Sequence, residues 1–193
     1  IQSSIITRKV SGRGCIVDAS INETDVDWMN NSVASVGVDG RRPLKQGSGA
    51  RGIAPYQAYA CADGHLVIAA PNDRLFQRLA DVLDHPEWSD DPRFNSNPSR
   101  YNNLDELNAA MEPILEGQTR AHWQGALREA GVPSAPVQTV PEMMVDPQTK
   151  ALGMLQNLDD GIDLMAMPLS FDGNRPPLRN HAPSLGEHNE MIK

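Results

Sequence analysis

Apolar residues recur at helical spacing in the middle of the chain. This pattern predicts three amphipathic helices, over residues 73–84, 103–116 and 120–130, because positions three and four apart share one face of a helix. Asn72 and Asp73 suit the start of the first helix, and Thr119 suits the cap of the third. The apolar faces consist of Leu75, Phe76, Leu79, Val82 and Leu83, of Leu104, Leu107, Met111 and Leu115, and of Trp123, Ala126 and Leu127.

Two runs of β-type residues, 56–60 and 65–70, precede these helices. The residues between them include Asp63 and Gly64, and Asp-Gly between such runs is typical of a β-hairpin. Shorter extended patterns cover 15–20, 132–140, 153–158 and 163–169. The mixture of helices and short strands predicts an α+β unit.

The flanking segments follow a different pattern. Residues 1–10 are typical of the end of a helix that stops at Gly12, and Ser20 with Glu23 forms a capping box for a second helix ending near Gly37. Segments 37–55 and 87–100 are predicted loops, with short helices at 141–144 and 147–152. Because the chain starts with Ile1 inside a helix, we expect it to be part of a longer protein.

Charge narrows the classes of function. The 193 residues carry a formal net charge of -8, which disfavours nucleic-acid binding because that function needs a basic surface. One local basic cluster, Arg41, Arg42, Lys45 and Arg51, is predicted to be a solvated loop if it stands alone.

Neither cysteines nor histidines form a recognisable site. Cys15 and Cys61 are expected to be small buried hydrophobic residues, and the five histidines lack metal-ligand spacing, so we predict no metal site. The Met and Leu residues of 143–167 are expected in a core. No run of about 18 apolar residues and no signal peptide is present, and we expect a cytoplasmic protein.

The sequence Gln46 to Gly52 is the most suggestive local motif. Its glycines, Gly47, Gly49 and Gly52, allow backbone N–H groups to approach an anion closely. The motif lacks the Gly-Lys-Ser/Thr of a P-loop and does not join a strand to a helix. By itself it therefore reads more readily as a flexible connector than as a ligand loop.

An ordered series of phrases resembles one family over essentially the whole chain, namely the C-terminal half of the CaiB/BaiF proteins, the family III CoA-transferases. The phrases are Gly12-Arg13-Gly14 with Val17-Asp18-Ala19-Ser20, Ala54-Pro55-Tyr56-Gln57-Ala58-Tyr59 with Ala62-Asp63-Gly64, Asn72-Asp73 with Phe76 and Leu79, Asp91-Pro92-Arg93-Phe94 with Asn97 and Arg100, Ala130-Gly131-Val132-Pro133 with Pro136-Val137, Asp146-Pro147-Gln148, and Leu185-Gly186-Glu187-His188.

The resemblance implies a fold and a domain organisation. Family members are α/β and α+β proteins, with a Rossmann-like large domain and a small α+β domain, and two chains interlock as a homodimer. Residues 54–145 would form the small α+β domain. Residues 1–53 would be a linker helix and loop from the large domain, and 146–193 the return segment to it.

The resemblance also implies a reaction. Such enzymes move CoA from an acyl-CoA thioester to a carboxylic acid through an aspartyl intermediate, with CoA as substrate and no permanently bound cofactor. The attacking aspartate lies upstream of the Gly-Arg-Gly turn, so no catalytic residue maps onto this chain, and Asp18 is not the nucleophile. We expect the chain alone to be inactive, and to expose apolar surface at 1–40 and 150–193 through which it self-associates.

One site does map onto the chain. The family's glycine-rich loop, which covers the active site, corresponds to Gly47, Ser48, Gly49 and Gly52. The α-methylacyl-CoA racemases of the same family carry a glutamate where this chain has Asn72, so racemization is the alternative reaction and the less favoured one. A non-catalytic subunit or binding module is the alternative of a different class.

Overall fold

The computed structural model describes residues 1–40, 42–158 and 161–192. Its chain divides into two units, residues 1–47 and 48–193, which are described separately. The first unit contains α1 (Gln2–Ser11), α2 (Ile21–Trp28) and α3 (Asn30–Asp39). None of its described residues is buried, so these helices lack a core of their own.

Local capping signals in the first unit are confirmed. Helix α1 ends at Gly12 with φ 71°, and Ser20 with Glu23 forms the predicted capping box of α2. The predicted second helix is divided at Met29 into α2 and α3, and it ends at Gly40 rather than near Gly37. Gly40 adopts φ 67°, the left-handed conformation that closes a helix.

Two further predictions for this unit are wrong. Residues 15–20 form no strand, since a strand requires hydrogen-bonding partners and no described strand pairs with this segment. Cys15 is exposed rather than buried, because the described residues of this unit form no core that it could enter. Cys61, by contrast, is buried as predicted, and burial raises the pKa of its thiol.

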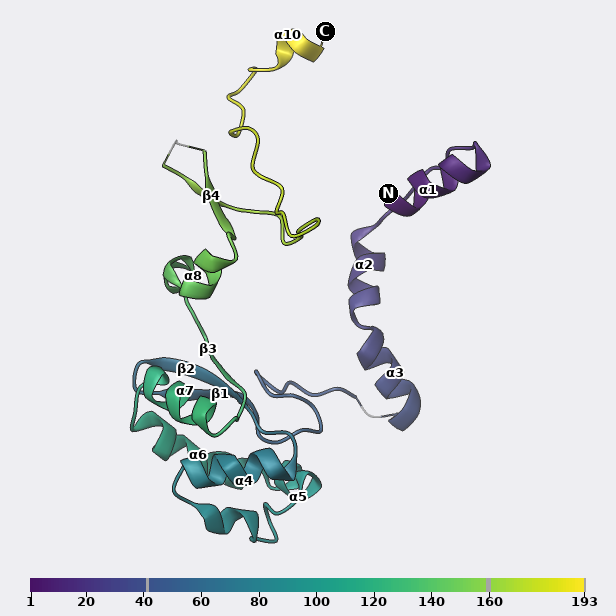
Figure 1. The fold of residues 1–193 in the computed structure, drawn as a ribbon. Coiled ribbons are helices and arrows are strands. Elements are labelled where there is room, and N and C mark those ends of the chain that lie inside the picture. Colours follow the sequence, from purple (N-terminus) through teal and green to yellow (C-terminus); the bar gives the residue numbers. More distant parts are fainter. Residues whose placement is uncertain (41, 159–160, 193) are drawn as a thin grey trace. The chain divides into compact units, whose positions relative to one another are not determined.

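The second unit is built on an antiparallel sheet with the order β1-β2-β3. The strands are β1 (Tyr56–Cys61), β2 (Gly64–Ala69) and β3 (Ser134–Pro136), and the first two form the predicted hairpin. Helices α4 (Asp73–Val82), α6 (Leu104–Glu116) and α7 (Arg120–Glu129) gather with this sheet in the blue-to-green part of Figure 1. All three helices were predicted from the apolar pattern and are confirmed.

The core lies between the sheet and these helices. Alternate residues of the hairpin are buried, which is the period-2 pattern of a sheet with one covered face. Asn72 and Thr119 cap α4 and α7 by accepting hydrogen bonds from Leu75 N–H and His122 N–H. The core includes Tyr59, Leu66, Ile68, Phe76, Leu79, Leu107, Met111, Leu115, Trp123 and Leu127.

The segment 87–100 was predicted as a polar loop, and this is wrong in part. It overlaps a 3-10 helix, Pro86–Ser89, and the start of α5 (Asn97–Asn102). Trp88, Phe94 and Arg100 are buried. The segment is rich in polar residues and prolines, so its pattern predicts a loop. The three buried side chains pack against residues elsewhere in the chain, and a local sequence pattern does not indicate such contacts.

The C-terminal part contains α8 (Val140–Val145), α9 (Pro147–Ala151), β4 (Leu155–Asn157), β5 (Asp163–Met165) and α10 (Asn189–Ile192). The prediction that the Met and Leu residues of 143–167 form a core is wrong for this chain. Among the described residues of 143–167 no Met or Leu side chain is buried: five are partly covered, and Leu152, Leu164, Met165 and Met167 are exposed. No element in the described chain covers their side chains.

The predicted exposure of apolar surface is confirmed. Most of the exposed large hydrophobic residues lie in 1–40 and 150–193, and Ile1, Val10, Ile16 and Val38 are each more than four-fifths exposed. Residues 54–132, in contrast, bury most of their large apolar side chains in one core. No described helix has the length and apolar character needed to cross a membrane.

Candidate functional site

The glycine-rich loop contains two residues with left-handed backbone. Gly47 has φ 59° and Gly52 has φ 77°, a region that costs residues with a Cβ about 1–2 kcal/mol. Gly47 is the last residue of the first unit, whereas Ser48, Gly49 and Gly52 belong to the second. Three of the four predicted site residues therefore lie in one unit.

The loop is attached to the edge of the sheet at its start. Ser48 Oγ accepts a hydrogen bond from Ala58 N–H at 3.0 Å, and Ala50 N–H donates to Tyr56 O at 2.9 Å. Strand β1 is an edge strand, so these bonds satisfy backbone groups that would otherwise face solvent. In this structure residues 48–50 of the loop therefore follow β1.

The loop is also attached at its end, to residues that the sequence analysis did not place in the site. Asn97 contacts Gly52 and Ala54, and Arg100 contacts Ala54. Both residues occur in one of the phrases that carry the family resemblance. Their presence in that phrase was the signal in the sequence that could have marked them. They lie more than 40 residues from the loop along the chain, so the sequence gave no reason to expect contact with it.

The basic residues near the loop are partly described. Arg41 lies outside the described residues, and Arg42, Lys45 and Arg51 are exposed. Exposure of these three side chains agrees with a solvated basic loop. In the described ranges, no group of three or more His, Cys, Asp or Glu side chains is placed to hold a metal ion.

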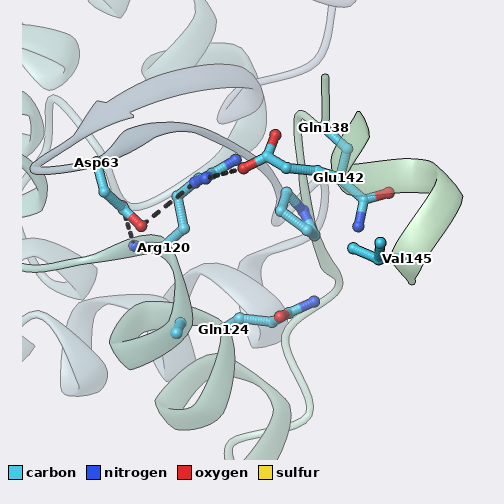
Figure 2. A pocket seen from close by; sticks show the side chains of 8 residues that line it. Asp63, Arg120, Gln124, Gln138, Glu142 and Val145 are labelled. Atoms are coloured by element: carbon cyan, nitrogen blue, oxygen red, sulfur yellow. Dashed lines mark hydrogen bonds and ion pairs between the residues drawn. The ribbon is translucent and has the colours of Figure 1, made fainter. Parts of the chain in front are cut away.

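A pocket of about 250 Å³ lies on the second unit beside the hairpin turn (Figure 2). At its centre is Arg120, the first residue of α7, whose backbone N–H donates to Asp63 Oδ1 at 2.7 Å. Its Nη1 donates to Val137 O at 2.8 Å and its Nη2 to Glu142 Oε1 at 2.7 Å. The lining residues are Asp63, Arg120, Ala121, Gln124, Pro136, Gln138, Glu142 and Val145.

The electrostatics of this pocket favour a structural role. The Arg120 guanidinium, followed by the N–H and hydroxyl of Thr139, lowers the pKa of Glu142 to about 2. Glu142 and Asp63 in turn raise the pKa of Arg120. The cation of the pocket is thus already paired with two carboxylates, and an anionic ligand would have to displace them. Arg120 ties the hairpin turn, α7 and α8 together.

Comparison with known proteins decides the family. A family model described as CoA-transferase family III matches residues 1–189. The chain belongs to CoA-transferase family III. It is 32% identical over 194 residues to the acetyl-CoA:oxalate CoA-transferase of Acetobacter aceti, covering 100% of this chain and 50% of that protein. It is 28% identical over 196 residues to the succinate–glutarate CoA-transferase of Agrobacterium fabrum, covering 100% and 49%.

Solved structures of family III proteins give the same result for the fold. A CaiB/BaiF family protein from Brucella suis matches with a TM-score of 0.86 and 31% identity, over 99% of this chain and 50% of that one. This confirms both the resemblance and the mixed α/β and α+β fold class. The chain spans about half the length of the family III relatives that it matches. The boundaries at 53 and 145 and the four site residues stay predictions.

Proposed function

We propose that this chain is part of a cytoplasmic CoA-transferase that moves CoA from an acyl-CoA thioester to a free carboxylic acid. The observation that carries this proposal is the family III match over residues 1–189. The two relatives described above are named as CoA-transferases, one for oxalate and the other for succinate and glutarate. Short dicarboxylic acids are therefore the acceptors we propose, with CoA as substrate and no permanently bound cofactor.

The proposed reaction proceeds through an aspartate supplied by sequence outside these 193 residues. Its carboxylate attacks the thioester, which releases CoA thiolate and forms a mixed anhydride. The thiolate then attacks the aspartyl carbonyl, releasing the first acid and leaving an aspartyl-CoA thioester. The acceptor carboxylate reverses both steps, so each bond broken is replaced by one of similar energy. We propose that two full-length chains interlock as a homodimer.

Gly47, Ser48, Gly49 and Gly52 are proposed to form the loop that covers this active site. Each step passes through an oxyanion, and backbone N–H groups are suited to stabilise one. The thioester and anhydride are both sensitive to water, so a loop with a fixed path also reduces hydrolysis. The attachment of Ser48 and Ala50 to β1 supports a loop of defined shape.

The alternative racemase reaction has no support at Asn72. This residue follows β2, where a racemase-like chain would need a proton-abstracting carboxylate. Its Oδ1 instead accepts a hydrogen bond from Leu75 N–H at 2.9 Å and caps α4. A neutral amide in a helix cap does not act as a general base.

The test uses the full-length natural protein with acetyl-CoA or succinyl-CoA and either oxalate or glutarate. We expect transfer of CoA to the dicarboxylate, detected by mass spectrometry of the CoA esters, and an aspartyl-CoA adduct on the protein. The 193-residue chain alone serves as the control and is expected to be inactive. Exchange of the α-proton in deuterated water without CoA transfer would favour racemization, and neither activity would favour the binding-module alternative.

A further inference from the structure

Asn97, the first residue of α5, contacts the end of the glycine-rich loop with both atoms of its side-chain amide. Its Nδ2 donates to Gly52 O at 3.0 Å, and its Oδ1 accepts from Ala54 N–H at 3.0 Å. One side chain thus fixes two backbone groups on either side of Ile53. One of these groups is the carbonyl of Gly52, which has a left-handed backbone. Asn97 thus restrains a glycine, the residue type with the greatest backbone freedom.

Arg100 lies one turn further along α5 and has no solvent exposure. Its Nε donates to Ala54 O at 2.8 Å, and its Nη1 donates to Phe94 O at 2.9 Å. The guanidinium also lies 4.4 Å from the centre of the Phe76 ring. A buried arginine is costly unless its donors are used, and here Nε, Nη1 and Nη2 each have an acceptor.

Asp73 joins the two residues. Its Oδ1 accepts from Arg100 Nη2 at 2.9 Å and from Asn97 N–H at 3.1 Å. Asp73 is in the first turn of α4, where a carboxylate is favoured by the helix dipole. Burial lowers the pKa of Arg100, and the hydrogen bond and charge of Asp73 oppose this change.

These contacts share one target. Side chains of α5 bind three backbone groups at the end of the loop, which are the N–H and C=O of Ala54 and the C=O of Gly52. The position of α5 is in turn fixed by a hydrogen bond to α4. Packing alone would be served by an apolar residue at position 100, without the cost of burying a guanidinium. The guanidinium of Arg100 and the amide of Asn97 are explained by their hydrogen bonds to the backbone at the end of the loop.

We propose that Asn97 and Arg100 are positioning residues that set the conformation of the glycine-rich loop. The catalytic part of this inference rests on the proposed function of the loop, whereas the conformational part does not. Asn97 is the more informative residue to change, because it is only half-buried and its removal leaves the core intact.

The test compares Asn97→Ala with Asn103→Ala in the full-length protein. Asn103 is a matched control, since its Nδ2 also donates to two backbone oxygens, of Arg93 and Ser99, but contacts nothing in the loop. Hydrogen exchange of the amides of Ala50, Ala54 and Ala58 is measured. We expect about tenfold faster exchange in Asn97→Ala, the effect of losing two hydrogen bonds, and no change in Asn103→Ala.

Asn97→Asp separates the two bonds. It keeps the acceptor for Ala54 N–H but cannot donate to Gly52 O, so exchange at Ala54 stays slow while the ratio of thioester hydrolysis to CoA transfer rises. Equal exchange in Asn97→Ala and Asn103→Ala would overturn the inference. Faster exchange with unchanged transfer and hydrolysis would support the positioning of the loop and contradict its proposed catalytic function.

Discussion

Arg120 Nη2 lies 2.7 Å from Glu142 Oε1, and this pair joins the first turn of α7 to α8. Arg120 also holds Val137 O, in the segment that connects β3 to α8. The side chain of Arg120 is mostly covered, whereas that of Glu142 is partly exposed. The pair is therefore a polar tether between the helix–sheet core and the segment that follows it.

This tether predicts a pH dependence. The pKa of Glu142 falls from 4.5 to about 2, so the ionised form is favoured by folding. The stabilisation is complete above about pH 4.5 and is lost as the pH falls towards 2. Glu142→Gln is expected to lower the melting temperature at pH 7, with a difference that shrinks below pH 4. A difference independent of pH would contradict the assignment.

Loss of the buried guanidinium is expected to destabilise the second unit. Arg100→Met removes the donors to Ala54 O and Phe94 O and leaves these carbonyls buried without partners, for which we expect about 3 kcal/mol. Arg74→Met, an exposed position on α4, is the control and is expected to change stability by less than about 0.5 kcal/mol. Urea unfolding measures both, and similar midpoints for the two variants would contradict the role of Arg100.

Substitution by alanine is expected to have opposite effects on stability at Gly52, which has a left-handed backbone, and at Gly125, which does not. Nothing lies within 4 Å of an added Cβ at Gly52 or at Gly125, so sterics with neighbours do not contribute. Gly52→Ala is expected to cost about 1 kcal/mol because φ is 77°. Gly125→Ala, inside α7, is expected to gain about 0.5–1 kcal/mol. Thermal unfolding of both variants checks the signs.

The exposed apolar surface of 1–40 and 150–193 predicts self-association of the 193-residue chain. Side chains such as Ile16 and Ile192 are more than four-fifths exposed, and burying them between copies removes apolar area from water. Light scattering is expected to give a mass above 21.1 kDa that rises with concentration. A clean monomer at all concentrations would show that this surface does not drive association.

Local interactions explain why much of the fold was predictable from sequence. Ser20, Asn72 and Thr119 cap their helices through bonds to residues three positions along, so the signal and its partner fall within one short window. The Asp63-Gly64 hairpin and the period of apolar residues in α4, α6 and α7 are equally local. The family resemblance rested on the order of such short phrases, and the match over 1–189 confirms it.

By itself the sequence determined α4, α6, α7, the hairpin and the family, because each depends on neighbours along the chain. Only the tertiary structure decided what residues 87–100 do, and that 15–20 is no strand. The guanidinium of Arg100 finds its acceptor in Ala54, 46 positions away, and that of Arg120 finds Glu142, 22 positions away. No periodicity encodes such a pairing. Folding brings these residues together because burying the apolar faces of the helices on the sheet leaves each guanidinium and its acceptors side by side.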